Sequence, residues 1–217
     1  MSKTLLSLGG AGVLSLAAAP AMAAVDPETA FVFNSFSFLV NGLVVMFMAA
    51  GFAMLESGLV RSKNTATICL KNIALYSISG IMFYLIGYNL MYVGVPEGGF
   101  IGSLDFLRNP SGDELALIGA GADKATPEMV SSVVKTNYSV PSDWFFQMVF
   151  VATAASIVSG TVAERIKVWP FLIFVVVLSG FIYPIQASWV WGGGWLAQMG
   201  FSDFAGSTLV HSTGGWA

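Results

Sequence analysis

The stretch FVFNSFSFLVNGLVVMFMAAGFAML, residues 31–55, decides the class of fold. It runs for 25 residues without one charged side chain. As a helix it would be about 37 Å long, at about 1.5 Å per residue. Roughly 20 apolar residues are enough to cross a hydrocarbon layer about 30 Å thick. The stretch therefore predicts a transmembrane helix.

The composition of the whole chain agrees with that prediction. Hydrophobic residues make up 56% of the 217 residues and charged residues only 10%, whereas soluble domains carry about 25% charged residues. No basic run suggests nucleic-acid binding. The single cysteine, Cys69, excludes an internal disulfide and a cysteine-based metal cluster. We expect it to be a small buried apolar side chain.

The first 23 residues predict a secretory signal peptide. Lys3 supplies a positive start, a short apolar run follows, and Ala21-Met22-Ala23 forms a cleavage pattern. The alternative is an uncleaved first transmembrane helix. We favour cleavage, because the apolar run is short and rich in glycine and alanine. Residues 24–217 are then the membrane domain, and the mature N-terminus faces outward.

Further runs predict further spans. Residues 73–95, 144–163 and 168–191 are uncharged and long enough to cross, and a fifth run covers residues 203–217. This fifth run would be about 22 Å long as a helix, which is too short to span. We therefore expect an all-α membrane protein truncated within its fifth helix. Pro184 should kink the fourth span or end its regular part early.

Charge predicts the orientation. The segments that follow the first and third spans hold five of the nine basic residues, and basic loops face the cytoplasm. The protein is then a multi-pass protein of the inner (plasma) membrane with its N-terminus outside. Glu56 and Glu164 lie beside these basic residues, so we expect both to be ion-paired. Residues 96–143 should form an outward-facing, partly ordered segment, to which we assign no function.

His211 is the strongest candidate functional residue, because it is the only histidine and an ionisable group at membrane depth indicates a functional site. The alternative is a histidine that only bonds a neighbouring helix. No second histidine or cysteine accompanies it, so we expect no metal. If the helix begins at Asp203, Phe204 shares a face with His211. Asp203 itself could cap that helix or contact a ligand.

Aromatic residues give a second set of candidates. Phe146 and Phe150 are four residues apart, so their rings should lie along one helix face, either as simple packing or as part of a site. Trp189 and Trp191 precede three glycines. They could be interfacial anchors or a cation-binding face. The glycines would let the backbone leave the helix and line a vestibule.

Three smaller expectations concern polar residues. Ser142 or Asp143 could cap the third span, after Pro141. Asn41 and Asn89 are single polar groups within spans, and we expect them to bond between helices.

Five strings carry a resemblance to a known family: GFAMLESGLVRSKN (51–64), FFQMVF (145–150), AERIK (163–167), VWGGGWLA (190–197) and DFAGSTLVH (203–211). They resemble the ammonium transporter family, which is related to the Rh glycoproteins, from about residue 31 to 217. The resemblance implies the N-terminal five-helix part of an eleven-helix fold. It also implies a homotrimer in membrane lipid, with one pore in each subunit.

The same resemblance implies roles for individual residues. Trp191 looks like the outer residue that recruits ammonium, and Phe146, or more closely Phe150, looks like part of a phenylalanine gate. Asp203 looks like the aspartate near the outer mouth of the pore, with a structural and electrostatic role. His211 looks like the first of two pore histidines. The second histidine, the second gate phenylalanine and a vestibule serine belong to later helices of the family.

The implied function is uptake of ammonium or ammonia, with methylammonium as an analogue, without a cofactor and without catalysis. A cytoplasmic nitrogen-signalling regulator is the implied partner. Two alternatives of the same superfamily stay open, an ammonium sensor and an Rh-type channel for the neutral gas. A membrane enzyme that pairs His211 with Asp203 is disfavoured, because eight residues separate them by about 12 Å along a helix.

Overall fold

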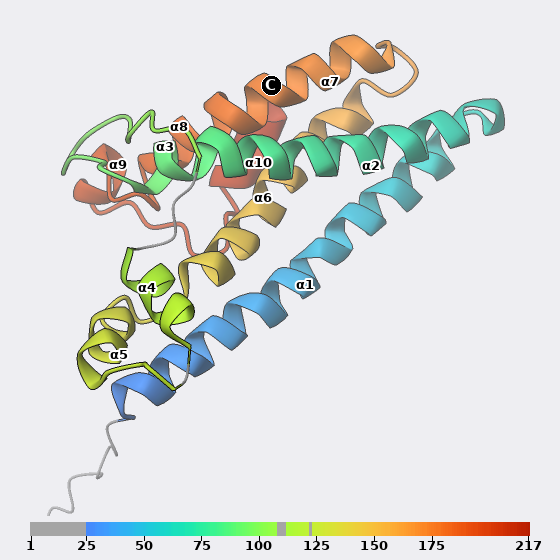
Figure 1. Cartoon of the computed structure of the whole chain (residues 1–217). Coiled ribbons are helices and arrows are strands. Elements are labelled where there is room, and N and C mark those ends of the chain that lie inside the picture. Colours follow the sequence, from blue (N-terminus) through green and yellow to red (C-terminus); the bar gives the residue numbers. More distant parts are fainter. Residues whose placement is uncertain (1–24, 108–111, 122) are drawn as a thin grey trace, which may run out of the picture.

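The structure is a computed structural model that describes residues 25–107, 112–121 and 123–217. The predicted signal peptide lies outside the described residues. Within these residues, four helical segments are long and apolar enough to cross a membrane: Pro27–Leu59, Ser62–Tyr92, Val140–Thr161 and Val168–Ser188. They form a bundle whose connections lie at two ends (Figure 1).

Helix α1 (Pro27–Leu59) is longer than the predicted first span at both ends. Asp26 caps it by accepting a hydrogen bond from the backbone N–H of Thr29 at 2.9 Å, and Pro27 occupies the first turn, where its missing N–H costs nothing. Only Gly42 and Glu56 are buried on this helix. Helix α1 therefore lies at the edge of the bundle, and most of its apolar side chains are exposed (Figure 1).

Two of the spanning segments contain a π-helical turn. Helix α2 (Thr65–Met82) continues through the π-turn Phe83–Gly87 into α3 (Tyr88–Tyr92). Helix α7 (Val168–Val177) continues through the π-turn Leu178–Ile182 into α8 (Tyr183–Ser188). Pro184 lies in the first turn of α8. The prediction that it ends the regular part of the fourth span is confirmed, because proline has no N–H to continue the α-helical pattern.

Helix α6 (Val140–Thr161) occupies the centre of the bundle and packs against α1, α2 and α10. Its start differs from the prediction: the N-cap is Ser139, while Ser142 and Asp143 lie inside the first turns. Pro141 is the reason, because proline is favoured just inside a helix start rather than before its cap. Alanines 152, 154 and 155 are fully buried on this helix, and such small residues let membrane helices pack closely.

The predicted helix from residue 203 is wrong. Helix α10 (Leu209–Trp216) begins six residues later, after a turn in which Gly206 has a φ of +75°. A positive φ interrupts a right-handed helix. Phe204 is fully exposed in that turn, so it shares no helix face with His211. The short helix α9 (Trp195–Gln198) precedes this turn.

Residues 96–143 contain two helices, α4 (Gly112–Ala120) and α5 (Pro127–Val134). Both lie beside the start of α1 (Figure 1). Two hydrogen bonds attach the residues after α5 to α1: Asn34 Nδ2 donates to the Asn137 carbonyl at 2.9 Å, and the Ser139 N–H donates to Ser35 Oγ at 2.8 Å. The residues between α5 and α6 are thus held against α1.

Three expectations about single residues are wrong. Cys69 is exposed, and its Sγ lies 3.5 Å from Ser57 Oγ. Asn41 donates to the Ser37 carbonyl of its own helix. Asn89 donates to the carbonyls of Asp105 and Leu107 in the following loop. Asparagine side chains readily bond to nearby backbone carbonyl groups, and both residues do so here.

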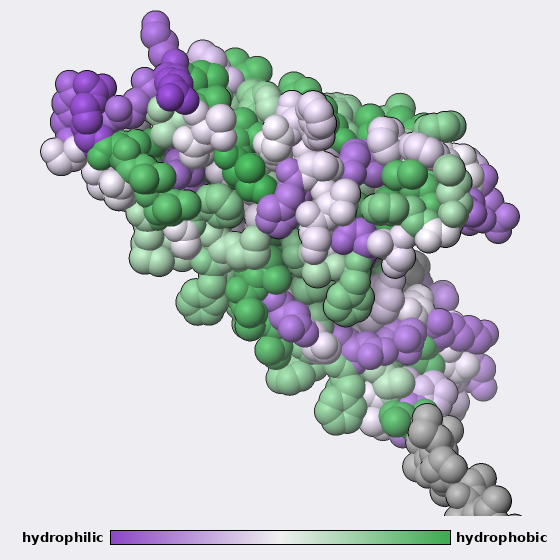
Figure 2. All heavy atoms as spheres, turned by 180° about the vertical axis from the view of Figure 1, so that it is seen from behind, coloured by the Kyte–Doolittle hydropathy of each residue, from purple (hydrophilic) through white to green (hydrophobic). Residues whose placement is uncertain are grey.

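Apolar side chains cover much of the surface between the polar ends (Figure 2). Phe33, Phe47, Trp169 and Ile173 are each at least 65% exposed. A soluble monomer rarely exposes such a continuous apolar area. The surface agrees with a multi-pass protein that contacts lipid.

Candidate functional site

Four aromatic rings from three parts of the chain form a continuous row. Phe38 of α1 stacks on Phe146 of α6 with centroids 5.2 Å apart, and Phe146 meets Phe150 edge-on at 5.1 Å. Phe150 then contacts the ring of Trp191 at 5.8 Å. All four side chains are only partly buried. The row therefore presents aromatic surface that a ligand or another segment can contact.

Trp191 is held by the turn that follows α8. Its Nε1 donates to the Asp203 carbonyl oxygen at 2.6 Å. Gly194 packs so closely that an added Cβ would lie 2.6 Å from the Gly99 carbonyl oxygen, and Gly193 has a φ of +77°. These positions require glycine. The three glycines thus bend the backbone and fix the indole ring.

Asp203 joins Trp191 to α10. Its side chain is buried, and its Oδ2 accepts hydrogen bonds from the backbone N–H groups of Thr208 at 2.9 Å and Leu209 at 2.7 Å. A carboxylate at a helix N-terminus satisfies free N–H groups and opposes the helix dipole. Asp203 is therefore a helix cap, although it acts from the preceding turn rather than from the first residue of a helix.

His211 lies exposed in the first turn of α10. Its Nδ1 is 3.4 Å from the Gly206 carbonyl oxygen. If Nδ1 carries the proton, Nε2 becomes the hydrogen-bond acceptor of a neutral imidazole. The Trp191 ring lies close to Gly206 as well, 3.1 Å from where a Cβ would be. Gly206 therefore lies between the two groups: the Trp191 ring packs against it, and its carbonyl oxygen lies next to the His211 ring.

Helix α10 packs tightly on α6. An added Cβ at Gly214 would lie 2.8 Å from Ile157 Cβ and 2.9 Å from the Ala154 carbonyl oxygen. Thr213 donates a hydrogen bond to Gln186 Oε1 of α8. The five residues predicted for the site, Phe146, Phe150, Trp191, Asp203 and His211, are therefore linked by a chain of contacts. The structure adds Phe38 and Gly206, which nothing in the sequence distinguishes from packing residues.

The site has the chemistry of a passage for a small cation or its neutral conjugate base. It offers aromatic ring faces, the carboxylate of Asp203, which caps α10, and the imidazole of His211. Aromatic faces attract cations, and a neutral imidazole both donates and accepts hydrogen bonds. Among the described residues, no group of three or more histidine, cysteine, aspartate or glutamate side chains could hold a metal.

A second polar cluster lies where α1, α2, α6 and α7 meet at residues 59–65 and 161–168, which we call the basic end. Arg61 pairs with Glu164 at 3.2 Å, and Lys71 pairs with Glu56 at 3.3 Å, so the prediction that both glutamates are ion-paired is confirmed. Lys71, however, lies inside α2 rather than in the loop, and both partners of its pair are almost fully buried.

The exposed pair is reinforced by hydrogen bonds to Glu164. Asn64 Nδ2 donates to Glu164 Oε1 at 2.6 Å, and the Arg61 backbone N–H donates to the same oxygen at 2.8 Å. These bonds, the one from Asn64 above all, lower the pKa of Glu164 below its usual value of 4.5. The loop after α1 is thereby attached to the loop after α6.

Four long apolar helices and a row of aromatic rings that leads to one histidine define a multi-pass helical membrane protein with a candidate solute passage. The chain belongs to the Ammonium Transporter Family, whose family model matches residues 36–217.

Individual relatives agree with the family model. Ammonium transporter Amt2 of Archaeoglobus fulgidus is 39% identical over 188 residues, which cover 82% of this chain and 35% of that protein. A solved structure described as a sensor Amt protein has a TM-score of 0.66 and 35% identity, covering 84% of this chain and 42% of that one. The crystal structure of Saccharomyces cerevisiae Mep2 has a TM-score of 0.68 and 26% identity, covering 88% and 40%.

Each of these matches covers most of this chain but less than half of the other protein. The chain spans about 35% of the Archaeoglobus protein and about 40% of the yeast structure.

Proposed function

We propose that this chain is part of a transporter that moves ammonium, or ammonia derived from it, across a membrane. The observation that carries the proposal is the contact chain from Phe146 through Phe150 to Trp191, and from Trp191 through Gly206 to His211, on an apolar helical scaffold. Membership of the Ammonium Transporter Family supports the choice of substrate. The protein is proposed to act as a transporter and not as an enzyme.

The physical route begins with recruitment of the cation. Ammonium is strongly hydrated, and burying it without partners is costly. The Trp191 face would stabilise the arriving ion by about 0.5–2 kcal/mol. Asp203 contributes by fixing Trp191 and by placing negative charge near the mouth, while its Oδ2 caps α10.

Passage then requires loss of the ionic charge. The Phe146 and Phe150 rings offer an apolar constriction that excludes hydrated sodium and potassium. His211 can hold ammonia by a hydrogen bond, or accept the proton that ammonium gives up, because a neutral imidazole has one donor and one acceptor nitrogen. No fixed positive charge then opposes the substrate in the passage.

We extend the proposal to the whole protein. The described helices would be the N-terminal part of an eleven-helix subunit, and three subunits would form a homotrimer in membrane lipid. The basic end would face the cytoplasm of an inner (plasma) membrane, with a cleaved signal peptide at residues 1–23. A cytoplasmic nitrogen-signalling regulator would bind at the basic end.

Methylammonium uptake by the full-length protein tests the transport function. Trp191→Ala should raise the half-saturating concentration about 2- to 30-fold, because the cation–π contribution is lost. His211→Ala should lower the maximal flux. Trp169→Ala removes a tryptophan that is 76% exposed on α7 and should leave uptake unchanged. Wild-type flux in both site variants would refute the site.

An ammonium sensor is the second candidate, and the likeness to the sensor Amt protein, at 35% identity, supports it. A sensor would bind methylammonium without sustained flux. An Rh-type channel for neutral ammonia is the third, and electrical recording separates it: an inward current on addition of ammonium indicates that charge moves and excludes passage of the neutral gas alone.

A further inference from the structure

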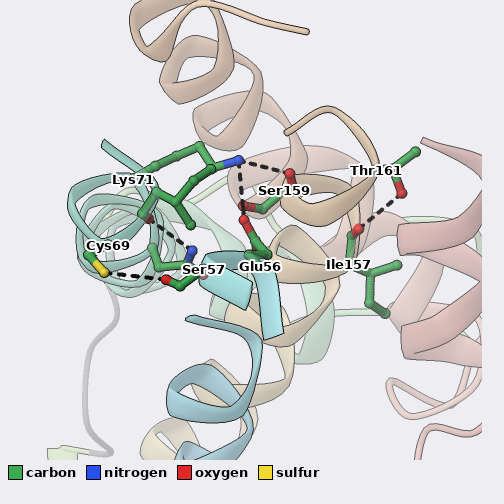
Figure 3. Close-up of polar contacts among 9 residues, drawn as sticks. Glu56, Ser57, Cys69, Lys71, Ile157, Ser159 and Thr161 are labelled. Atoms are coloured by element: carbon green, nitrogen blue, oxygen red, sulfur yellow. Dashed lines mark hydrogen bonds and ion pairs between the residues drawn. The ribbon is translucent and has the colours of Figure 1, made fainter. Parts of the chain in front are cut away.

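The buried ion pair at the basic end holds an unused carboxylate oxygen. Glu56 of α1 and Lys71 of α2 have side chains that are only 1% and 4% exposed. Lys71 Nζ donates to the Ser159 carbonyl oxygen at 2.8 Å and lies 5.0 Å from the centre of the Phe171 ring. Glu56 Oε2 accepts the hydroxyl of Ser159 at 2.8 Å (Figure 3). Four helices therefore meet at this pair.

The second oxygen of Glu56 has no such partner. Oε1 is buried and accepts no hydrogen bond among the described residues. A buried carboxylate oxygen without a donor is costly, and an unsatisfied group of this kind in a native protein indicates a missing water or ion. Lys71 does not fill this role, because its charge is already shared between Oε2, a carbonyl oxygen and an aromatic face.

A cavity reaches Glu56 from the surface of the basic end. It measures about 390 Å³ and lies between the last turns of α1 and α6, where Glu56, Val60, Arg61, Gly160, Thr161 and Arg165 line it. Gly160 leaves room beside the carboxyl group, since an added Cβ would lie 3.7 Å from Glu56 Cγ. The cavity is large enough for a small ion together with several waters, at about 30 Å³ of liquid for each water.

The charged side chains that line the cavity balance, two glutamates against two arginines, so backbone dipoles and free acceptors decide what it can hold. Two helix C-termini, of α1 and α6, point their free carbonyl groups toward this end, and each carries a partial negative charge. The two arginines are engaged elsewhere: Arg61 Nε pairs with Glu164, and Arg165 Nη1 donates to the Thr161 carbonyl oxygen at 3.0 Å. Glu56 Oε1 is then the acceptor left for a ligand that donates N–H groups.

Helix α6 connects this cavity to the aromatic row. One face of α6 holds three partly buried residues, Phe146, Phe150 and Ile157. Gly160 and Thr161 continue this face toward the end of the helix, and both are exposed. The residues on the other faces, including Ala152, Ser156 and Ser159, are fully buried against neighbours. This face of α6 carries the aromatic row at one end and the cavity residues at the other, and α10 packs against it between them, at Ile157.

We propose that Glu56 forms a second binding site for ammonium, at the basic-end mouth of the passage, distinct from the aromatic site near Trp191. This inference rests on the proposed transport of ammonium. The ion donates one N–H to Glu56 Oε1 and keeps waters in the rest of the cavity. Lys71 and Ser159 hold the other oxygen, so the carboxylate is oriented before the ion arrives. The site retains ammonium as it leaves the passage, or captures it when the gradient is reversed.

The test measures methylammonium entry from each side separately, with the full-length protein in right-side-out and inside-out membrane vesicles. Glu56→Gln alone leaves Lys71 without its counter-charge and could prevent folding. The double variant Glu56→Gln/Lys71→Met removes both charges and so avoids an uncompensated lysine. Glu128→Gln is the control, because this carboxylate is exposed on α5, away from the cavity.

The double variant should raise the half-saturating methylammonium concentration about ten-fold or more in inside-out vesicles, as expected for loss of one charge-assisted hydrogen bond. The value in right-side-out vesicles should not change, and Glu128→Gln should match wild type in both. Equal half-saturation of wild type and double variant in inside-out vesicles would overturn the site.

Failure of the transport function gives a different result. If the wild-type protein shows no saturable flux from either side, the proposed transport is wrong. The Glu56 site is then tested by the binding of methylammonium. Methylammonium should then raise the melting temperature of the Trp191→Leu protein relative to the same concentration of potassium. That rise should disappear when Glu56→Gln/Lys71→Met is added. No rise in the Trp191→Leu protein, or an equal rise in both proteins, refutes the site.

Discussion

At the scale of single residues, Gly206 controls the candidate site more than its size suggests. It has a φ of +75°, its carbonyl oxygen lies next to His211 Nδ1, and the Trp191 ring packs where its side chain would be. One small residue therefore sets the distance between the indole and the imidazole.

Gly206→Ala should destabilise the protein and impair methylammonium uptake. A residue other than glycine in this backbone region costs about 1–3 kcal/mol, and the new Cβ would lie 2.6 Å from Val210 Cγ2 and 3.1 Å from the indole. Gly215→Ala is the control: no atom lies within 4 Å of its Cβ position, and alanine inside a helix is favoured by about 0.5–1 kcal/mol. Thermal unfolding of both variants in detergent checks this, and equal melting temperatures would contradict it.

The sequence predicts site residues better than it predicts their geometry. His211, Trp191 and the two phenylalanines follow from rare residue types and from family motifs. The positive φ of Gly206, which starts α10 at Leu209 rather than at Asp203, depends on the indole and on the capping carboxylate. The indole belongs to Trp191, which lies outside residues 203–217, so the periodicity of these residues alone predicts one helix and a false pairing of Phe204 with His211.

At the scale of elements, the contact between α1 and α6 sets where the aromatic row lies. An added Cβ at Gly42 would lie 2.7 Å from the Phe145 ring and 3.4 Å from Phe146 Cα. The two helices approach each other at this glycine, and Phe38, one turn earlier on α1, reaches the Phe146 ring.

Gly42→Leu should force α1 away from α6 and lower stability by about 1–3 kcal/mol, the usual cost of overpacking. Gly51→Leu, on the same helix, is the control, because nothing lies within 4 Å of its Cβ position. Thermal unfolding of the full-length protein measures the difference. A Gly42→Leu protein as stable as the Gly51→Leu protein would show that the close approach is unnecessary.

Apolar length predicts the four spanning segments, since lipid offers no partner for exposed backbone. It does not predict the two π-turns, or that α1 extends to Leu59. The turn at Leu178–Ile182 has a local cause in Pro184, and the one at Phe83–Gly87 packs beside it. A pairing between segments nearly a hundred residues apart leaves no local signal in either sequence.

The two loops of the basic end form one unit through Glu164, and acid should separate them. The pKa of Glu164 is lowered by its bonds to Asn64 and Arg61, so its stabilising contribution is complete above the ordinary value of 4.5 and is lost as pH falls through the lowered value. Glu164→Gln should melt below wild type at pH 7, and the difference should vanish at sufficiently acid pH. A difference that is constant with pH would mean that charge plays no part.

At the scale of the whole molecule, charge and surface imply one orientation in the membrane. Exposed apolar residues cover the spans, the basic residues Arg61, Lys63, Arg165 and Lys167 gather at one end, and α4 and α5 lie away from it (Figures 1 and 2). Positive charge is retained on the cytoplasmic side. The site at Trp191 would then receive substrate from outside, and the cavity at Glu56 would open inward.

Cysteine labelling in intact cells tests this orientation. Cys69→Ser removes the only native thiol, and single cysteines are then introduced as Lys63→Cys at the basic end and Lys124→Cys between α4 and α5. Both positions are exposed in the structure. A membrane-impermeant maleimide should label the Lys124 position in intact cells and the Lys63 position only after the membrane is opened. Labelling in the reverse order would invert the proposed topology, and the aromatic site and the Glu56 cavity would exchange their assigned sides.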